Sequence, residues 1–249
     1  MFRTIFYFLY QPYKWLVFLP LAFLLTLLFG VLAVVFSLSI NQKTGSFIGG
    51  AIWSRVLCFL TPVTVKVLGK ENIDPGQSYI ITPNHQSMYD IFVLYGWIGI
   101  DIRWMMKKEL RRVPGVGFGS EKVGHIFLDR SNQRAALQSL SEAKQKLQGG
   151  TSVVIFPEGT RGNGQDLLAF KRGAFKLAID LQLPILPVSI IGTNKILGAK
   201  AKFDIFPGRA VIQIHPPVDI APYSDKNIQI LMNLVQQTLA KQSKDTARD

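Results

Sequence analysis

The chain has 249 residues, of which 48% are hydrophobic and 18% charged, and its mean hydropathy is +0.23. This apolar content excludes a disordered chain and exceeds what a water-soluble core needs, which indicates that part of the sequence contacts lipid. The 28 Lys and Arg residues against 16 Asp and Glu residues give a net charge of +12, so nucleic acid, anionic lipid or phosphorylated substrates are the expected partners. The single cysteine, Cys58, excludes an intrachain disulfide and a cysteine-rich metal site, and its apolar surroundings favour a buried, inert thiol.

Residues 1–63 are interpreted as a membrane anchor, because the hydrophobic excess is concentrated there. Residues 1–70 contain no Asp or Glu, and no charged residue occurs from Trp15 to Gln42. As a helix, the 26 residues from Trp15 to Ile40 would be about 39 Å long, which exceeds the roughly 30 Å hydrocarbon layer of a bilayer. The stretch is also longer than the apolar core of a cleaved signal peptide, so a retained anchor is favoured.

A second apolar stretch, residues 47–63, follows the polar sequence NQKTGS and leaves two arrangements open. In one, the first segment spans the membrane once and the second lies along the interface. In the other, both segments form a re-entrant hairpin within one leaflet. Basic residues occur on both sides of the first segment, so the excess of positive charge on cytoplasmic loops does not decide the orientation.

Residues 64–249 are interpreted as one α/β domain. Short β-branched and apolar runs alternate there with amphipathic stretches, which is typical of a sheet covered by helices on both faces. Helical spacing of apolar residues predicts helices over 131–148, 170–181 and 226–241. The last eight residues, 242–249, are expected to fray. Seven strands are predicted, at residues 64–69, 78–83, 103–107, 125–129, 152–156, 185–191 and 210–215.

His85 is the candidate general base, because it follows a predicted strand that ends at Pro83. Asp90 lies five residues further on, and in a straight helix the two side chains would point about 140° apart. They can meet only if the chain bends between them, and Ser87 can supply that bend by capping a new helix. Asp90 would then hold one imidazole nitrogen protonated and leave the other free. The alternative is that Ser87 and Asp90 form only a helix-capping pair.

The loop after the strand at 152–156 is a candidate phosphate site. Glu158, Gly159, Thr160 and Arg161 follow Pro157 there, and backbone amides, a hydroxyl and a guanidinium can together receive a phosphate. The alternative is an Arg–Glu surface pair in a turn.

Further cations follow two other predicted strands. Residues 107–112 contain Lys107, Lys108 and two arginines, a run that is either a solvated face or part of a binding edge. Asp129 and Arg130 end the strand before the predicted helix over 131–148. Because several strand ends carry His, Asp, Lys or Arg, the sequence indicates one basic active-site edge.

The remaining motifs exclude several other chemistries. His125 and His215 are interpreted as structural, and neither forms a recognisable metal-ligand spacing with His85 or Asp90. The chain has no G-x-S-x-G nucleophile motif and no P-loop motif. The glycines within residues 115–119 are interpreted as a loop rather than a dinucleotide-binding fingerprint, because a proline precedes them.

The motifs at these strand ends resemble those of the glycerolipid acyltransferases in order and approximate spacing. The matching blocks cover roughly residues 80–191, and Gly162 and Ala169 depart from the pattern, which leaves the shape of the acceptor loop open. The blocks are NHQSMYD, KKEL with a proline and glycine behind it, GHIFLDR, FPEGTR and LPILPVSI.

The resemblance implies a central β-sheet flanked by helices, with transfer of a fatty acyl group from acyl-CoA or acyl-carrier protein to the sn-2 hydroxyl of lysophosphatidic acid. It implies that His85 and Asp90 are catalytic and that no metal or other cofactor is needed. It also implies a location on the cytoplasmic face of a bacterial inner membrane, with the bilayer as partner and no specific nucleic acid. The substrate-binding residues that it implies are Asn84, Lys107, Lys108, Arg130, Glu158, Gly159, Thr160 and Arg161.

Two other interpretations remain at this stage. Motifs shared by the whole family do not distinguish lysophosphatidic acid from glycerol 3-phosphate, another lysophospholipid or a lyso-ornithine lipid as acceptor. A non-enzymatic lipid-binding protein would explain the anchor and the charge, but not a His–Asp pair beside an EGTR loop.

Overall fold

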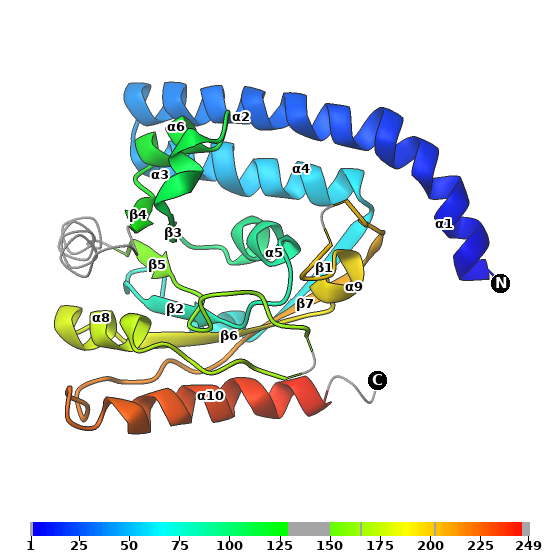
Figure 1. Cartoon of the computed structure of the whole chain (residues 1–249). Coiled ribbons are helices and arrows are strands. Elements are labelled where there is room, and N and C mark those ends of the chain that lie inside the picture. The colour runs from blue at the N-terminus through cyan, green and yellow to red at the C-terminus, as the bar shows by residue number, and fades with distance from the viewer. Residues whose placement is uncertain (1, 129–149, 165, 202, 246–249) are drawn as a thin grey trace.

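The structure is a computed structural model that describes residues 2–128, 150–164, 166–201 and 203–245. A hairpin of helices, formed by the first 60 residues, lies along one side of an α/β domain (Figure 1). The predicted helix over 131–148, together with Asp129 and Arg130, lies outside the described residues.

The hairpin consists of two helical runs that meet at residues 40–41. Asn41 starts the second run, because its side-chain oxygen accepts the backbone N–H of Thr44 at 2.8 Å. The runs approach closely where glycine faces alanine: a Cβ on Gly49 would lie 2.2 Å from the Cβ of Ala33. The first run is α1 (Phe2–Tyr13), the π-helical η1 (Lys14–Phe18) and α2 (Leu19–Ser39); the second is α3 (Gln42–Ser46), the π-helical η2 (Phe47–Ile52) and α4 (Trp53–Leu60).

The domain is built on a seven-stranded sheet with the order β1-β7-β6-β2-β5-β3-β4. All neighbouring strands are parallel except β6 and β7. All seven strand predictions are confirmed, because buried parallel strands are nearly continuous apolar runs. The strands are β1 (Val63–Leu68), β2 (Ile80–Pro83), β3 (Ile102–Lys107), β4 (Ile126–Leu128), β5 (Ser152–Val154), β6 (Ile185–Ile191) and β7 (Gly208–Ile214).

Helices cover both faces of this sheet, as the alternating pattern predicts. In Figure 1, α8 (Gly173–Leu181) and α10 (Ile228–Asp245) lie on one face, and α5 (Tyr89–Trp97) lies between the other face and the hairpin. One expectation is wrong: a short helix begins at Gly117 where a loop was expected. Of the last eight residues, which are expected to fray, α10 includes those through Asp245, and residues 246–249 lie outside the described residues. The remaining elements are the 3₁₀ turns η3 (Lys70–Asn72) and η4 (Lys108–Arg112), with helices α6 (Gly117–Lys122) and α9 (Thr193–Ile196).

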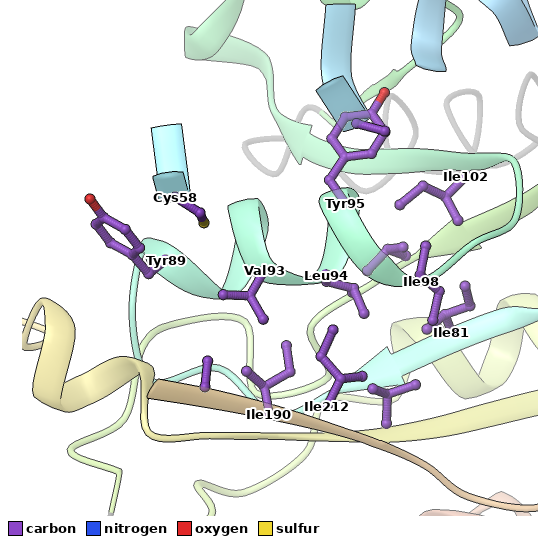
Figure 2. Close-up of a cluster of buried hydrophobic side chains, with 14 of the residues drawn as sticks. Cys58, Ile81, Tyr89, Val93, Leu94, Tyr95, Ile98, Ile102, Ile190 and Ile212 are labelled. Carbon is purple, nitrogen blue, oxygen red and sulfur yellow. The ribbon is translucent and has the colours of Figure 1, made fainter. Parts of the chain in front are cut away.

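Helix α5 joins the hairpin to the sheet through its apolar side chains. In Figure 2, Val93 and Leu94 point from α5 toward Ile190 and Ile212 of the sheet. Each is completely buried, and burying a side chain of this size contributes roughly 1.5–3 kcal/mol. On the hairpin side, Tyr95 hydrogen-bonds to Ser46, with 2.7 Å between the two hydroxyl oxygens. The hairpin is therefore part of the packed core and not a separate appendage.

Candidate active site

The parallel strands bring the predicted functional segments to one edge of the sheet. Strands β6, β2, β5 and β3 run in the same direction, so the loops after their carboxyl ends share that edge. The loop after β2 carries His85, the loop after β5 carries Glu158, and β3 ends at Lys107. Thr193, which sequence reasoning did not identify, follows β6 at the same edge.

His85 and Asp90 are in direct contact, as the proposed bend requires. The distance from His85 Nδ1 to Asp90 Oδ2 is 2.8 Å. Because a carboxylate oxygen accepts hydrogen bonds, Nδ1 is the donor and Nε2 is the unprotonated nitrogen of a neutral ring. The His85 ring stacks on Phe156, with 3.7 Å between ring centroids and 16° between planes, which fixes its orientation.

The bend forms at Ser87, before α5 begins. Ser87 Oγ accepts the backbone N–H of Tyr89 at 3.0 Å and donates to the carbonyl of Leu197 at 2.7 Å. Asp90, in the first turn of α5, accepts the backbone N–H groups of Gln86 and Ser87 on Oδ2 at 2.7 and 2.8 Å. Capping and the His–Asp contact therefore occur together, and the two readings of Asp90 are not exclusive.

Thr193 completes the hydrogen bonds of Asp90. Its hydroxyl donates to Asp90 Oδ1 at 2.5 Å, and both side chains are fully buried. One carboxylate oxygen thus faces His85 and two backbone amides, while the other is held by Thr193. This arrangement prevents the carboxylate from rotating away from the imidazole.

Glu158 holds the His85 loop from the side of β5. Its Oε1 accepts the backbone N–H of His85 at 2.8 Å, and its Oε2 accepts that of Leu168 at 2.9 Å. The pKa of the Glu158 carboxyl is raised, because the effect of burial exceeds that of these two hydrogen bonds, which lower it. The backbone N–H of Gly162 donates to the carbonyl of His85 at 2.8 Å, so the two loops are joined directly.

A cleft lies beside these residues, with an empty volume of about 790 Å³ that includes its open mouth. Amide and hydroxyl side chains line it together with His85, one lysine and two carboxylates, so it can hold a polar ligand. Of the predicted site residues, Asn84, His85 and Glu158 line it. Sequence reasoning missed its other polar residues, which are Gln86, Asp166, Ser189, Asn194 and Lys195.

The rest of the predicted phosphate loop lies beyond Glu158. Gly159 has a φ of +70°, a conformation that favours glycine, and the side chain of Lys171 lies against it. Thr160 is exposed and Arg161 is half-buried. Arg161 forms no hydrogen bond or ion pair with another residue that the structure describes. Because its side chain lies against Gly159, Lys171 adds a cation to this loop that the sequence did not indicate.

The lysines after β3 lie further along the edge. Lys107 and Lys108 are both exposed, and neither lines the cleft as far as the described residues define it. Arg130, the remaining predicted site residue, lies outside the described residues. The sheet order places β5 between β3 and β2, so the end of β3 is one strand further from His85 than the end of β5 is.

Comparison with known proteins decides the family. A family model described as acyltransferase matches residues 64–191, which is more than half of the chain and contains both loops. The chain belongs to the acyltransferase family.

The chain has two relatives that are named for the same activity. It is 38% identical over 146 residues to the 1-acyl-sn-glycerol-3-phosphate acyltransferase of Helicobacter pylori, covering 57% of this chain and 60% of that protein. It is 30% identical over 182 residues to 1-acyl-sn-glycerol-3-phosphate acyltransferase alpha of Mus musculus, covering 73% of this chain and 64% of that protein. The chain thus spans less than two thirds of the length of these relatives.

A solved structure resembles the acyltransferase over nearly its whole length. The crystal structure of the 1-acyl-sn-glycerophosphate (LPA) acyltransferase from Thermotoga maritima matches with a TM-score of 0.81 and 26% identity. The match covers 99% of this chain and 98% of the other. It therefore includes the helical hairpin as well as the α/β domain.

The other two histidines of the acyltransferase and its cysteine lie in the core. His125 Nδ1 accepts the backbone N–H of Trp104 at 3.4 Å, and His125 Nε2 lies 3.3 Å from the Tyr95 hydroxyl. His215 Nε2 lies 2.9 Å from Ser189 Oγ, and burial lowers the pKa of His215. Burial raises the pKa of the Cys58 thiol to about 12, so this thiol is not a nucleophile at neutral pH.

Proposed function

We propose that the chain transfers a fatty acyl group from a thioester donor to the sn-2 hydroxyl of lysophosphatidic acid, forming phosphatidic acid. The observation that carries this proposal is the His85–Asp90 pair, whose imidazole lines a cleft beside the EGTR loop. The names of the relatives from Helicobacter pylori and Mus musculus, both 1-acyl-sn-glycerol-3-phosphate acyltransferases, support the same acceptor. The donor is acyl-CoA or acyl-carrier protein.

The proposed reaction proceeds by direct attack. His85 Nε2 removes the proton from the acceptor hydroxyl, and the oxygen attacks the thioester carbonyl. Asp90 accepts the Nδ1–H and stabilises the imidazolium that forms. The tetrahedral intermediate then collapses, the C–S bond breaks, and His85 returns its proton to the departing thiolate. A positioned base contributes about 10²–10⁴-fold to the rate, and no metal or cofactor takes part in these steps.

We assign the acceptor phosphate to the loop of Gly159, Thr160 and Arg161. Gly162 of this loop is hydrogen-bonded to the carbonyl of His85, so a phosphate bound here lies close to the base. In lysophosphatidic acid the phosphate and the free hydroxyl are on neighbouring carbons of glycerol, which matches that proximity. Arg161 can bind the phosphate in a bidentate manner, and Lys171 adds positive charge.

We propose that the helical hairpin holds the enzyme on one leaflet of the membrane. The helix over Phe8–Ser39 is long and apolar enough to span a bilayer by length and composition. However, it touches the α/β domain at two distant points: Tyr10 stacks on Phe206, and the backbone of Gly30 lies against Gly115. These contacts are roughly 30 Å apart along the helix, so the domain would have to enter the bilayer if the helix crossed it.

A hairpin that lies flat with its apolar outer face in lipid satisfies both observations. In this arrangement the acceptor can keep its acyl chain in the bilayer while its headgroup reaches the base. We place the hairpin on the cytoplasmic face of a bacterial inner membrane, where both candidate donors are made available to the enzyme.

The test incubates the detergent-solubilised protein with labelled acyl-CoA and three acceptors in parallel: lysophosphatidic acid, glycerol 3-phosphate and lysophosphatidylcholine. Acyl-carrier protein replaces CoA if none reacts. Phosphatidic acid formed only from lysophosphatidic acid, and lost in His85→Ala, is the expected result. A His85-dependent reaction with another acceptor would keep the chemistry and overturn the substrate. Full activity in a folded His85→Ala protein would overturn the mechanism.

A further inference from the structure

We propose that residues 108–122 of the catalytic domain form a second membrane contact, which binds the anionic headgroup layer beside the helical hairpin. This segment comprises η4, the four residues that follow it, and α6. The inference rests on the membrane association in the proposed function but not on its acyl-transfer chemistry.

The segment exposes apolar side chains that the fold does not cover. Phe118 is 61% exposed, although it lies in a helix whose neighbours Gly117 and Gly119 are buried. Val113 and Leu110 are also exposed. Apolar side chains that project from a short segment in this way are typical of proteins that insert side chains into the headgroup region of a bilayer.

Cations accompany these side chains. Lys108, Arg111, Arg112 and Lys122 lie in the segment, against two acidic residues. Arg111 pairs with Glu121 at 3.1 Å while about half of each side chain remains exposed, and the ammonium of Lys122 lies 5.4 Å from the ring centroid of Phe118. Lys and Arg beside exposed apolar groups match a surface whose lipid tails lie under anionic headgroups.

The segment lies directly on the membrane-facing helix α2. A Cβ on Gly115 would lie 2.9 Å from the backbone oxygen of Thr26, and one on Gly119 would lie 3.2 Å from that of Gly30. This backbone-to-backbone contact places α6 alongside α2, as Figure 1 shows at the end of the hairpin near α3. Leu28 and other residues on the outer side of α2 are exposed. The segment therefore lies next to the helix that we place in lipid.

The segment connects the active-site edge of the sheet to the helical hairpin. It begins immediately after β3, whose end belongs to the active-site edge, and it ends packed on α2. Lipid headgroups bound along it would thus extend from the hairpin toward the loops that hold the base and the phosphate site. An anionic lipid surface is the occupant that fits this charge, this apolar exposure and this continuity.

The test uses site-specific labelling of the full chain. Cys58 is fully buried, so an introduced exposed cysteine is the thiol that an environment-sensitive dye labels, with the wild-type protein as background. Phe118→Cys reports on the segment, and Ile230→Cys is its matched control, because Ile230 is also 61% exposed and belongs to α10, a helix on the side of the domain opposite the hairpin in Figure 1. Leu28→Cys reports on the hairpin. Val113→Cys replaces Phe118→Cys if that variant does not fold.

Each labelled protein is reconstituted into phosphatidylcholine vesicles, with or without phosphatidylglycerol, and the dye is quenched by a nitroxide in the lipid or by iodide in water. We expect lipid quenching at positions 28 and 118 and iodide quenching at position 230. Lipid quenching at position 118 is expected to be stronger in the anionic vesicles. Adding Arg111→Gln and Arg112→Gln is expected to remove that difference, since each cation near an anionic surface strengthens binding about fivefold.

The outcomes distinguish failure of the second membrane contact from failure of the membrane anchor on which it rests. Lipid quenching at position 28 with iodide quenching at 118 would overturn the second contact and leave the anchored hairpin intact. Iodide quenching at both positions would overturn the membrane anchor itself. Equal lipid quenching in neutral and anionic vesicles would overturn headgroup recognition by the arginines.

Discussion

The loop after β2 and the loop after β5 lie side by side at the sheet edge, but they differ in how tightly the fold holds them. The imidazole of His85 in the β2 loop is fixed by ring stacking on Phe156 and by its hydrogen bond to Asp90, whose carboxylate, at the start of α5, also accepts backbone N–H groups of that loop. In the β5 loop, Glu158 is buried and bonded, whereas Thr160 is exposed and Arg161 is half-buried without a hydrogen bond to another residue that the structure describes. The fold therefore pre-organises the group assigned to the chemistry and leaves the group assigned to binding open to a ligand.

This difference predicts a division of kinetic effects. Substitutions in the β2 loop network should lower kcat, because a base that is already positioned is needed in the transition state. Substitutions in the open part of the β5 loop should raise KM for the acceptor, because they remove an interaction made with bound substrate.

The largest effect among these is expected from Asp90→Asn. The amide can keep the contacts of Asp90, with its nitrogen facing the hydroxyl of Thr193, but it carries no charge to stabilise an imidazolium. We expect kcat to fall by about 10²–10⁴-fold with little change in KM or thermal stability. Steady-state kinetics measures kcat and KM, and a melting curve is the control for folding. An unchanged kcat would contradict the assignment of the chemistry to His85 and Asp90.

Arg161→Gln is expected to have the next largest effect. Loss of a charge-assisted contact to phosphate should raise KM for lysophosphatidic acid by about 10–100-fold, while kcat changes little. Arg172→Gln is the control, since Arg172 is an exposed arginine on the chain after this loop whose Nη2 lies 3.5 Å from the backbone carbonyl oxygen of Asp225. Equal effects of the two substitutions would remove Arg161 from the acceptor site.

Thr193→Val tests whether the third partner of Asp90 acts through that carboxylate. The buried Asp90 oxygen would lose its donor, and we expect kcat to fall about tenfold. Thr193→Ser, which keeps the hydroxyl, should restore most of the activity. In the Asp90→Asn background the valine should have little further effect on kcat, and additive losses would show that Thr193 acts independently of Asp90.

The smallest effect is expected on the pH dependence of stability, from substitution of His215, which lies outside both loops. Burial lowers the pKa of His215 in the folded protein, so below about pH 6.5 the unfolded chain binds more protons and the free energy of unfolding falls as pH falls. His215→Gln cannot titrate and can still bond to Ser189. Its melting temperature should therefore fall less than that of the wild type on acidification, and parallel curves would contradict this.

The sequence predicted those features that depend on neighbouring residues. Continuous apolar runs predicted every strand, and the capping pattern from Ser87 to Asp90 predicted a bend that would bring His85 to Asp90, which is the geometry observed. Thr193 and Asn194 were missed because they reach the site only through the position of β6 beside β2. The periodicity of a short stretch of sequence does not determine the order of strands in a sheet.

The arrangement of the hairpin also depends on contacts between residues far apart in the sequence. Hydropathy located both apolar segments but left two arrangements open, because the antiparallel packing depends on the backbone contact of Gly49 with Ala33. Likewise, the helix at Gly117 was expected as a loop, since what supports it is the surface of α2 nearly 90 residues earlier and not its own six residues.

The most direct test of the division between the loops is a parallel determination of kcat and KM for lysophosphatidic acid in Asp90→Asn and Arg161→Gln. The account predicts a fall in kcat alone for the first variant and a rise in KM alone for the second. A change in the same constant for both, in folded proteins, would contradict the assignment of chemistry to the β2 loop and of acceptor binding to the β5 loop.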